Sequence, residues 1–145
     1  MSINPALYSS AKDDWETPKD LFETLNNEFH FTLDAAADIN NAKCTRYFDK
    51  AADGLKQEWN GVVWLNPPYN RKIEGWIVKA VRETLNGVTT VMLLPARTSN
   101  EWFHRYIYNR YETRFLRGRL KFAGAENVAP FPSMVVIFKG IEPNV

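Results

Sequence analysis

The sequence predicts a single α/β domain with one open sheet, parallel in its middle and antiparallel at its end. Three observations predict it. Short apolar strand segments alternate with amphipathic helical segments in the first part of the chain, which favours parallel strands joined by crossover helices. The last strand segments have no helical segment between them, so they should pair antiparallel. At 145 residues, the chain has room for one core and no second domain.

The first helix is predicted over residues 18–28. Thr17 has the residue type of an N-cap, Pro18 suits the first helical position and Asp20 suits the first turn. Leucine and phenylalanine residues follow at helical spacing, so the helix should have one apolar face.

Two short strands should follow this helix. Residues 31–33 form the first, which ends at Asp34, and residues 45–48 form a brief second one. Between 39 and 60 the chain is rich in turn-forming residues. Residues 35–61 are too few for two full crossover units with their strands, so we expect the helix after the first strand to be missing or reduced.

The centre of the sheet is predicted from two fully apolar segments. Residues 62–65 (Val-Val-Trp-Leu) are β-branched and aromatic, and turn residues and two prolines bound them. A helix over 71–86 follows, and residues 88–94 form the next strand. Residues 62–65 and 88–94 are both predicted to be buried strands.

The C-terminal part should supply one helix and three strands. Thr98 and Glu101 have the spacing of a capping box, which would open a helix reaching about Tyr108. The strands are predicted at 114–116, at 119–122 after a turn at Gly118, and at 133–138.

Composition and patterning set the limits of the domain. Residues 1–14 lack periodicity and are expected to form a flexible arm before a domain at 15–140 and a tail at 141–145. No apolar run reaches the length of a membrane span and the first residues are not signal-like, so we expect a cytoplasmic protein without membrane contact. Cys44 is the only cysteine, which excludes an internal disulfide, and with two histidines it leaves no basis for a metal cluster.

The segment Asn66-Pro67-Pro68-Tyr69, directly after the strand at 62–65, says most about function. Two consecutive prolines cannot continue a β-ladder, so the chain should leave the strand in a rigid extended loop. Open α/β sheets bind ligands at this end of their strands. The Asn66 side-chain carbonyl, the Pro67 carbonyl and the Tyr69 ring could together hold a planar ring that bears an amino group. The alternative is a proline-rich stop with only a structural role.

Basic residues cluster in the C-terminal third. Seven cations and two anions lie between residues 97 and 121. Such a stretch could follow a phosphate backbone, or it could be a solvated helix face with a strand edge protected by charge. The seven are Arg97, Arg105, Arg110, Arg114, Arg117, Arg119 and Lys121.

Several motifs, in order along residues 15–138, resemble a known family. They are W-E-T-P, F-T-L-D-A-A-A-D, D-G-L followed by W, L-N-P-P-Y, L-L-P-A-R, W-F-H and G-R-L-K-F. In this order they resemble phage- or prophage-type DNA N-6-adenine methyltransferases of the small Dam family. The resemblance implies a Rossmann-like methyltransferase sheet and S-adenosylmethionine-dependent methylation of the exocyclic amino group of adenine in DNA.

The resemblance also implies residues that bind the methyl donor. Trp15, Thr17 and Pro18 match the segment expected near the methionine end of S-adenosylmethionine. On the residues alone, Trp15 could instead be a core anchor.

Acidic residues are implied at two further donor contacts. Asp34, with Ala35 and Ala36, matches the first-strand motif that approaches the donor's amino and carboxylate groups. Asp53 would accept a hydrogen bond from the donor's adenine amino group. Either aspartate could instead be a turn or helix cap.

The chemistry expected of the Asn-Pro-Pro-Tyr motif needs no general base. Asn66 and the Pro67 carbonyl would accept hydrogen bonds from the amino group and favour a pyramidal nitrogen, so positioning supplies much of the rate. In a duplex that nitrogen is stacked and paired, so the base must be flipped out. Tyr69 would stack on the base, and Phe122 or Phe131 could close its other face. DNA contacts are assigned to Arg97, Arg117, Arg119, Lys121 and Phe122.

The chain departs from the usual pattern in its first motif. Ala35-Ala36-Ala37 stands where most donor-binding domains of this kind have a glycine-rich loop. Part of the close backbone approach that glycine permits is therefore lost. We also expect fewer strands than such sheets usually have.

Two alternative functions stay open at this point. The motif also suits methylation of glutamine side chains in proteins, and the missing glycine loop would suit an inactive, nucleic-acid-binding remnant. Target specificity should lie in the loops at 70–72 and 124–132, or in pairing of two chains as a homodimer.

Overall fold

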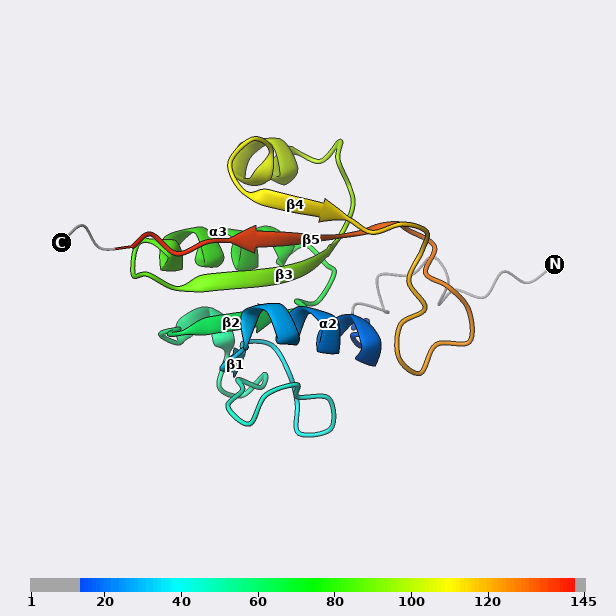
Figure 1. Cartoon of the computed structure of the whole chain (residues 1–145), viewed down its shortest axis with the longest axis horizontal. Helices are drawn as coiled ribbons and strands as arrows, with labels where there is room; N and C mark the ends of the chain where they lie inside the picture. Colours follow the sequence, from blue (N-terminus) through cyan, green and yellow to red (C-terminus); the bar gives the residue numbers. More distant parts are fainter. Residues whose placement is uncertain (1–13, 143–145) are drawn as a thin grey trace.

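The computed structural model describes residues 14–142 and contains one open sheet of five strands in the order β1-β2-β3-β5-β4 (Figure 1). β1, β2 and β3 are parallel, and β5 runs antiparallel to both β3 and β4. The predicted α/β class, the small number of strands and the antiparallel end of the sheet are confirmed. The strands are β1 (Leu33–Asp34), β2 (Val62–Leu65), β3 (Thr89–Pro95), β4 (Glu112–Phe115) and β5 (Ser133–Phe138).

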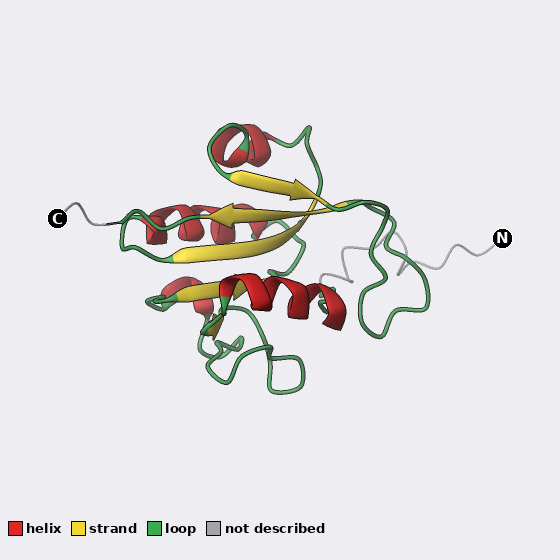
Figure 2. Ribbon diagram, viewed as in Figure 1, coloured by secondary structure: helices red, strands yellow, loops and turns green. Residues whose placement is uncertain are grey.

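Two α-helices cover opposite faces of this sheet, α2 (Lys19–Phe29) in front and α3 (Ile73–Thr84) behind it (Figure 1, Figure 2). Their apolar faces form because leucines, isoleucines and aromatics recur at helical spacing. In α2, Phe22 packs edge-on against Trp64 of β2, with ring centroids 5.5 Å apart. Among residues 14–142, no helix is both long and apolar enough to cross a membrane.

The helix after the first strand is absent, as predicted. Between β1 and β2 the chain forms only one short 3₁₀ turn, Gly54–Lys56. The strand predicted at 45–48 is reduced to a single parallel bridge between Asp34 and Tyr47. Phe48 N donates to Asp34 O at 3.0 Å and Asp34 N donates to Arg46 O at 3.1 Å, so this loop covers the free edge of β1.

Gly54 packs its backbone closely against the alanine-rich first loop. A Cβ at position 54 would lie 2.1 Å from the carbonyl oxygen of Ala35. The Trp59 indole donates to the Gly54 carbonyl at 2.8 Å. The D-G-L segment and the tryptophan after it therefore hold the loop against β1, because only glycine fits at that contact.

Two predictions for the C-terminal part are wrong. Residues 119–122 form no strand, and there is no hairpin with its turn at Gly118. The backbone there forms hydrogen bonds within its own loop, since Ala129 N donates to Leu120 O at 2.7 Å. The capping box at Thr98 does not form either: the Thr98 carbonyl is bonded to His104 Nε2 at 2.6 Å, and the helical stretch ends in a π-helical turn, Phe103–Ile107.

Candidate active site

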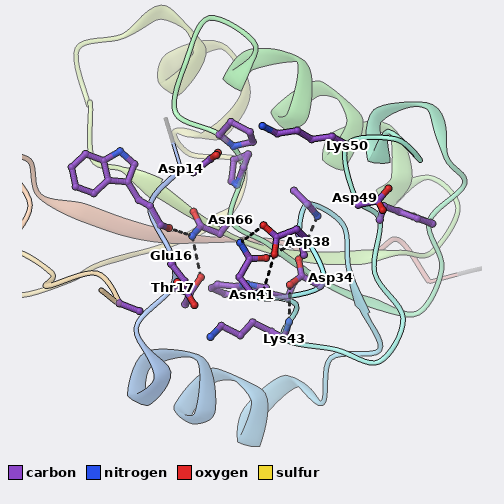
Figure 3. Close-up of a pocket in the computed structure, with 18 of the residues that line it drawn as sticks. Asp14, Glu16, Thr17, Asp34, Asp38, Asn41, Lys43, Asp49, Lys50 and Asn66 are labelled. Atoms are coloured by element: carbon purple, nitrogen blue, oxygen red, sulfur yellow. Dashed lines mark hydrogen bonds between the residues drawn. The ribbon is translucent and has the colours of Figure 1, made fainter. Parts of the chain in front are cut away.

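A cleft of about 550 Å³ opens where β1 and β2 end. The two strands are parallel neighbours, and their register places Asp34 opposite Trp64, two residues before Asn66, so Asp34 and Asn66 lie at the same edge of the sheet. Figure 3 shows Asn66, Thr17 and Asp34 around this cleft. Its volume lies within the range of small-molecule sites. The lining residues come from segments 14–17, 34–51, 64–68 and 122–123.

The side chain of Asn66 is held at one end only. Its Nδ2 donates to the main-chain carbonyl of Trp15 and, at 3.0 Å, to Thr17 Oγ1. Its Oδ1 is buried and has no hydrogen-bond partner. Leaving a buried acceptor unpaired costs about 1–3 kcal/mol, so a donor group on a ligand would be favoured there.

Thr17 does not cap the first helix as predicted. Pro18 occupies the N-cap position of α2 and makes no side-chain capping bond, while the Thr17 hydroxyl is buried against Asn66. Thr17 and Trp15 line the cleft. Pro18, the N-cap of α2, does not line it. The W-E-T-P segment therefore meets the Asn-Pro-Pro-Tyr segment directly.

Asp34 presents a buried carboxylate at the end of β1. Its Oδ2 accepts from Lys43 N at 3.0 Å and its Oδ1 from Ala36 N at 3.3 Å. Burial raises the pKa of Asp34 from 3.8 to about 6, and these two amides and the Lys43 charge offset only part of the effect. Ala36 lines the cleft beside it, while Ala35 is fully buried under Gly54. A carboxylate in a cleft whose pKa is raised by burial is a candidate for a functional residue.

The aromatic residues near the motif form one cluster. The ring of Trp15 lies 5.3 Å from that of Phe122 and 5.1 Å from that of Phe131, and Trp15 and Phe122 line the cleft. Tyr69 lies behind them, edge-on to Phe131 at 5.7 Å, and its hydroxyl donates to Leu93 O at 3.1 Å. Burial raises the pKa of this phenol. The predicted stacking of a base on Tyr69 would thus require its ring to leave this packing.

Asp53 lies outside the cleft. It has a φ of 58° and its carboxylate accepts from Leu55 N at 3.1 Å, so it caps the 3₁₀ turn, which is the turn role considered for it. Asp49, earlier in the same loop, lines the cleft instead.

Sequence reasoning missed most of what the loop after β1 contributes. A long polar loop after a strand end is a common place for binding residues, and this was the available signal. Asp38 shapes the loop by accepting from Asn40 N at 2.7 Å and Asn41 N at 3.0 Å. The lining residues not predicted from it are Ala37, Asp38, Asn41, Lys43, Phe48, Asp49, Lys50 and Ala51.

The basic stretch divides into paired and exposed cations. Arg114 is held by Glu28 at 2.7 Å and Glu112 at 2.6 Å, and Arg105 by Glu101 at 2.9 Å. Within residues 14–142, four of the predicted DNA contacts are exposed and form no ion pair, whereas Phe122 is buried in the cleft wall. The loop between β4 and β5 projects at the end of the sheet where α2 begins (Figure 1). The four exposed residues are Arg97, Arg117, Arg119 and Lys121.

Comparison with known proteins gives consistent matches. A family model described as DNA N-6-adenine-methyltransferase (Dam) matches residues 5–144. The DNA N-6-adenine-methyltransferase of Escherichia phage T1 is 32% identical over 114 residues, which cover 77% of this chain and 48% of the phage protein. A protein of Escherichia coli (strain K12) named "Putative methyltransferase YfdM" is 35% identical over 65 residues, covering 39% of this chain and 71% of that protein. This chain thus spans about half the length of the phage relative.

Proposed function

This chain belongs to the DNA N-6-adenine-methyltransferase (Dam) family, and from this premise we propose that it transfers a methyl group from S-adenosylmethionine to the exocyclic amino group of adenine in DNA. The observation that carries the proposal is that one cleft is lined both by Asn66, whose buried Oδ1 has no hydrogen-bond partner, and by Asp34. Asn66 Oδ1 suits an amino group that is to be methylated, and the Asp34 carboxylate suits a cationic methyl donor.

The residues of the cleft fit S-adenosylmethionine. Asp34 would bind the ammonium of its methionine part, because a bound cation would offset the cost of the buried carboxylate charge. Asp49 would accept the hydrogen bond from the donor's adenine amino group that was first expected of Asp53, because Asp49 lines the cleft and Asp53 does not. The donor supplies an electrophilic methyl group when bound.

Asn66 acts on the nitrogen that receives the methyl group. The lone pair of adenine's amino nitrogen is delocalised into the ring, which makes the nitrogen a poor nucleophile. Hydrogen bonds from the amino group to Asn66 Oδ1 and to the Pro67 carbonyl favour a pyramidal nitrogen with an available lone pair. No side chain has to remove a proton first, so the placement of these acceptors supplies much of the rate.

The target base has to leave the duplex to reach Asn66. Trp15 and Phe122 provide aromatic surface in the wall of the cleft, and Tyr69 would join them only after its ring rotates out of its packing. The exposed cations at the same end of the molecule would bind the phosphates on either side of the base.

The direct test is the transfer reaction itself. Purified protein incubated with S-adenosylmethionine labelled in its methyl group and with DNA should place label on adenine. Label in cytosine or in protein, with none in adenine, would contradict the proposal. Failure to bind the donor at all would favour the inactive nucleic-acid-binding remnant.

We expect Arg117 and Arg119 to contribute to DNA binding. Both are exposed in the loop between β4 and β5. Replacing both with alanine should weaken DNA binding and flatten the logarithmic salt dependence by up to about two, since each phosphate contact adds about 0.9 to the slope. Affinity for S-adenosylmethionine should not change.

A matched control removes the same charge elsewhere. Arg82, in the last turn of α3, and Lys139, directly after β5, are exposed and lie away from the segments that line the cleft. The double variant Arg82→Ala and Lys139→Ala should keep the wild-type salt slope. If the salt dependence of DNA binding has the same slope in both double variants, Arg117 and Arg119 do not form the DNA-binding surface.

A further inference from the structure

We propose that Thr17 is a positioning residue which, together with the main-chain carbonyl of Trp15, orients the Asn66 amide so that Oδ1 faces the target amino group. The inference rests on the proposed function of the cleft. It assigns Thr17 a role in catalysis rather than in capping α2 or binding the donor.

The chemistry of the two partners determines which end of the amide they hold. The Trp15 carbonyl has no hydrogen to donate, so the Asn66 atom bonded to it must be the nitrogen. Thr17 Oγ1 lies 3.0 Å from the same nitrogen and accepts its second hydrogen. Both Nδ2 hydrogens are thereby used, and Oδ1 is the atom left without a partner. A flipped amide would present a donor to the amino group of adenine, which is also a donor.

The segment that holds Asn66 is itself fixed on both sides. On one side it runs through Pro18 into α2, where Phe22 N donates to Pro18 O at 3.1 Å. On the other, the Glu16 carbonyl accepts from Ala123 N of the β4–β5 loop at 2.9 Å. Thr17 is 3% exposed, so its hydroxyl is confined against Asn66. A rigid partner of this kind keeps the acceptor in one orientation, which is where positional catalysis gains its rate.

The arrangement explains why an amide and not a carboxylate suits position 66. A carboxylate offers acceptor oxygens to the substrate as an amide does, but it has no hydrogen for the Trp15 carbonyl. Asn66→Asp would set a charged oxygen against that carbonyl in a place where burial makes the repulsion costly.

Three variants test the role through turnover. Thr17→Val keeps the side-chain volume and removes the acceptor, and it should lower kcat about 3- to 10-fold with an unchanged KM for the donor. Thr17→Ser restores the hydroxyl and should stay within about threefold of wild type. Asn66→Asp should lose about 100-fold or more. Wild-type kcat in Thr17→Val, equal losses in the valine and serine variants, or near-normal turnover in Asn66→Asp would each overturn the inference.

A second measurement does not depend on activity. The side-chain amide protons of Asn66, assigned by nuclear magnetic resonance through their absence in Asn66→Asp, should exchange slowly with water in wild type and in Thr17→Ser and faster in Thr17→Val. If slow exchange is lost only in Thr17→Val, the amide orientation is supported. If the same wild-type protein transfers no methyl group, the proposed function is contradicted while the amide orientation still holds. Fast exchange in wild type would overturn the orientation whatever the activity.

Discussion

Asn66→Ala should lower turnover by roughly 100-fold or more while donor affinity stays near normal. The unpartnered Oδ1 is the side-chain acceptor that the cleft offers to an amino group, and removing one placed polar contact to a reacting group costs about that factor. Single-turnover methyl transfer to DNA measures the chemical step, and calorimetry measures donor binding.

The control for this variant is Asn86→Ala. Asn86 is exposed after α3 and lies outside the segments that line the cleft, so turnover should stay at the wild-type level. If Asn66→Ala retains activity within a few-fold of wild type, Asn66 is not the acceptor and the strand-end motif has a structural role.

Asp34→Ala should weaken binding of S-adenosylmethionine by about 1.5–3 kcal/mol, or about 10- to 150-fold, through loss of a charge-assisted hydrogen bond. The carboxylate also accepts from two backbone amides of the loop after β1. Asp34→Asn keeps the shape and one of these two backbone bonds while it removes the charge, so it disturbs the loop less than Asp34→Ala does. Loss of the native circular dichroism spectrum in both variants would instead show that Asp34 serves mainly the fold.

The same residue gives donor binding a pH dependence of known sign. With a pKa raised to about 6, Asp34 is ionised above that pH in the free protein and protonated below it. Donor affinity should therefore be highest near pH 7, where Asp34 is ionised and the donor's ammonium keeps its proton, and it should fall by up to about tenfold per unit below pH 6, where Asp34→Asn should show no such step. Affinity of the wild type that rises on acidification would contradict the role of the carboxylate.

Folding stability should respond to pH in the opposite direction. Because the folded-state pKa of Asp34 exceeds its ordinary value of 3.8, its contribution to stability is fully present below that value and is lost as pH rises through about 6. At neutral pH the donor-free protein thus carries an unfavourable buried charge, which a bound cation would offset.

The elements that position the site were predictable from local patterns. The strand at 62–65, the two amphipathic helices and the missing crossover helix all follow from hydrophobic periodicity and segment length, and the structure confirms them. The placement of Asp34 and Asn66 at one edge of the sheet was predictable too, because they lie at the ends of parallel strands that are neighbours.

The contacts that override local signals were not predictable. Thr17 before a proline has every local feature of an N-cap, yet its hydroxyl bonds to Asn66, far away in sequence. Asp49 and Asp53 lie in the same turn-rich loop, and only the folded loop shows that Asp49 lines the cleft while Asp53 caps a turn. The segment at 119–122 has the alternation of a strand, but Phe122 packs on Trp15 instead of joining the sheet.

The measurement that tests the central claim most directly is mass spectrometry of nucleosides from DNA incubated with purified protein and S-adenosylmethionine carrying an isotopically labelled methyl group. We expect labelled N6-methyldeoxyadenosine with the wild-type protein and a loss of about 100-fold or more with Asn66→Ala under the same conditions. Label found in deoxycytidine or in the protein instead, or equal labelling of deoxyadenosine by both proteins, would contradict the assignment of this cleft as an adenine methylation site.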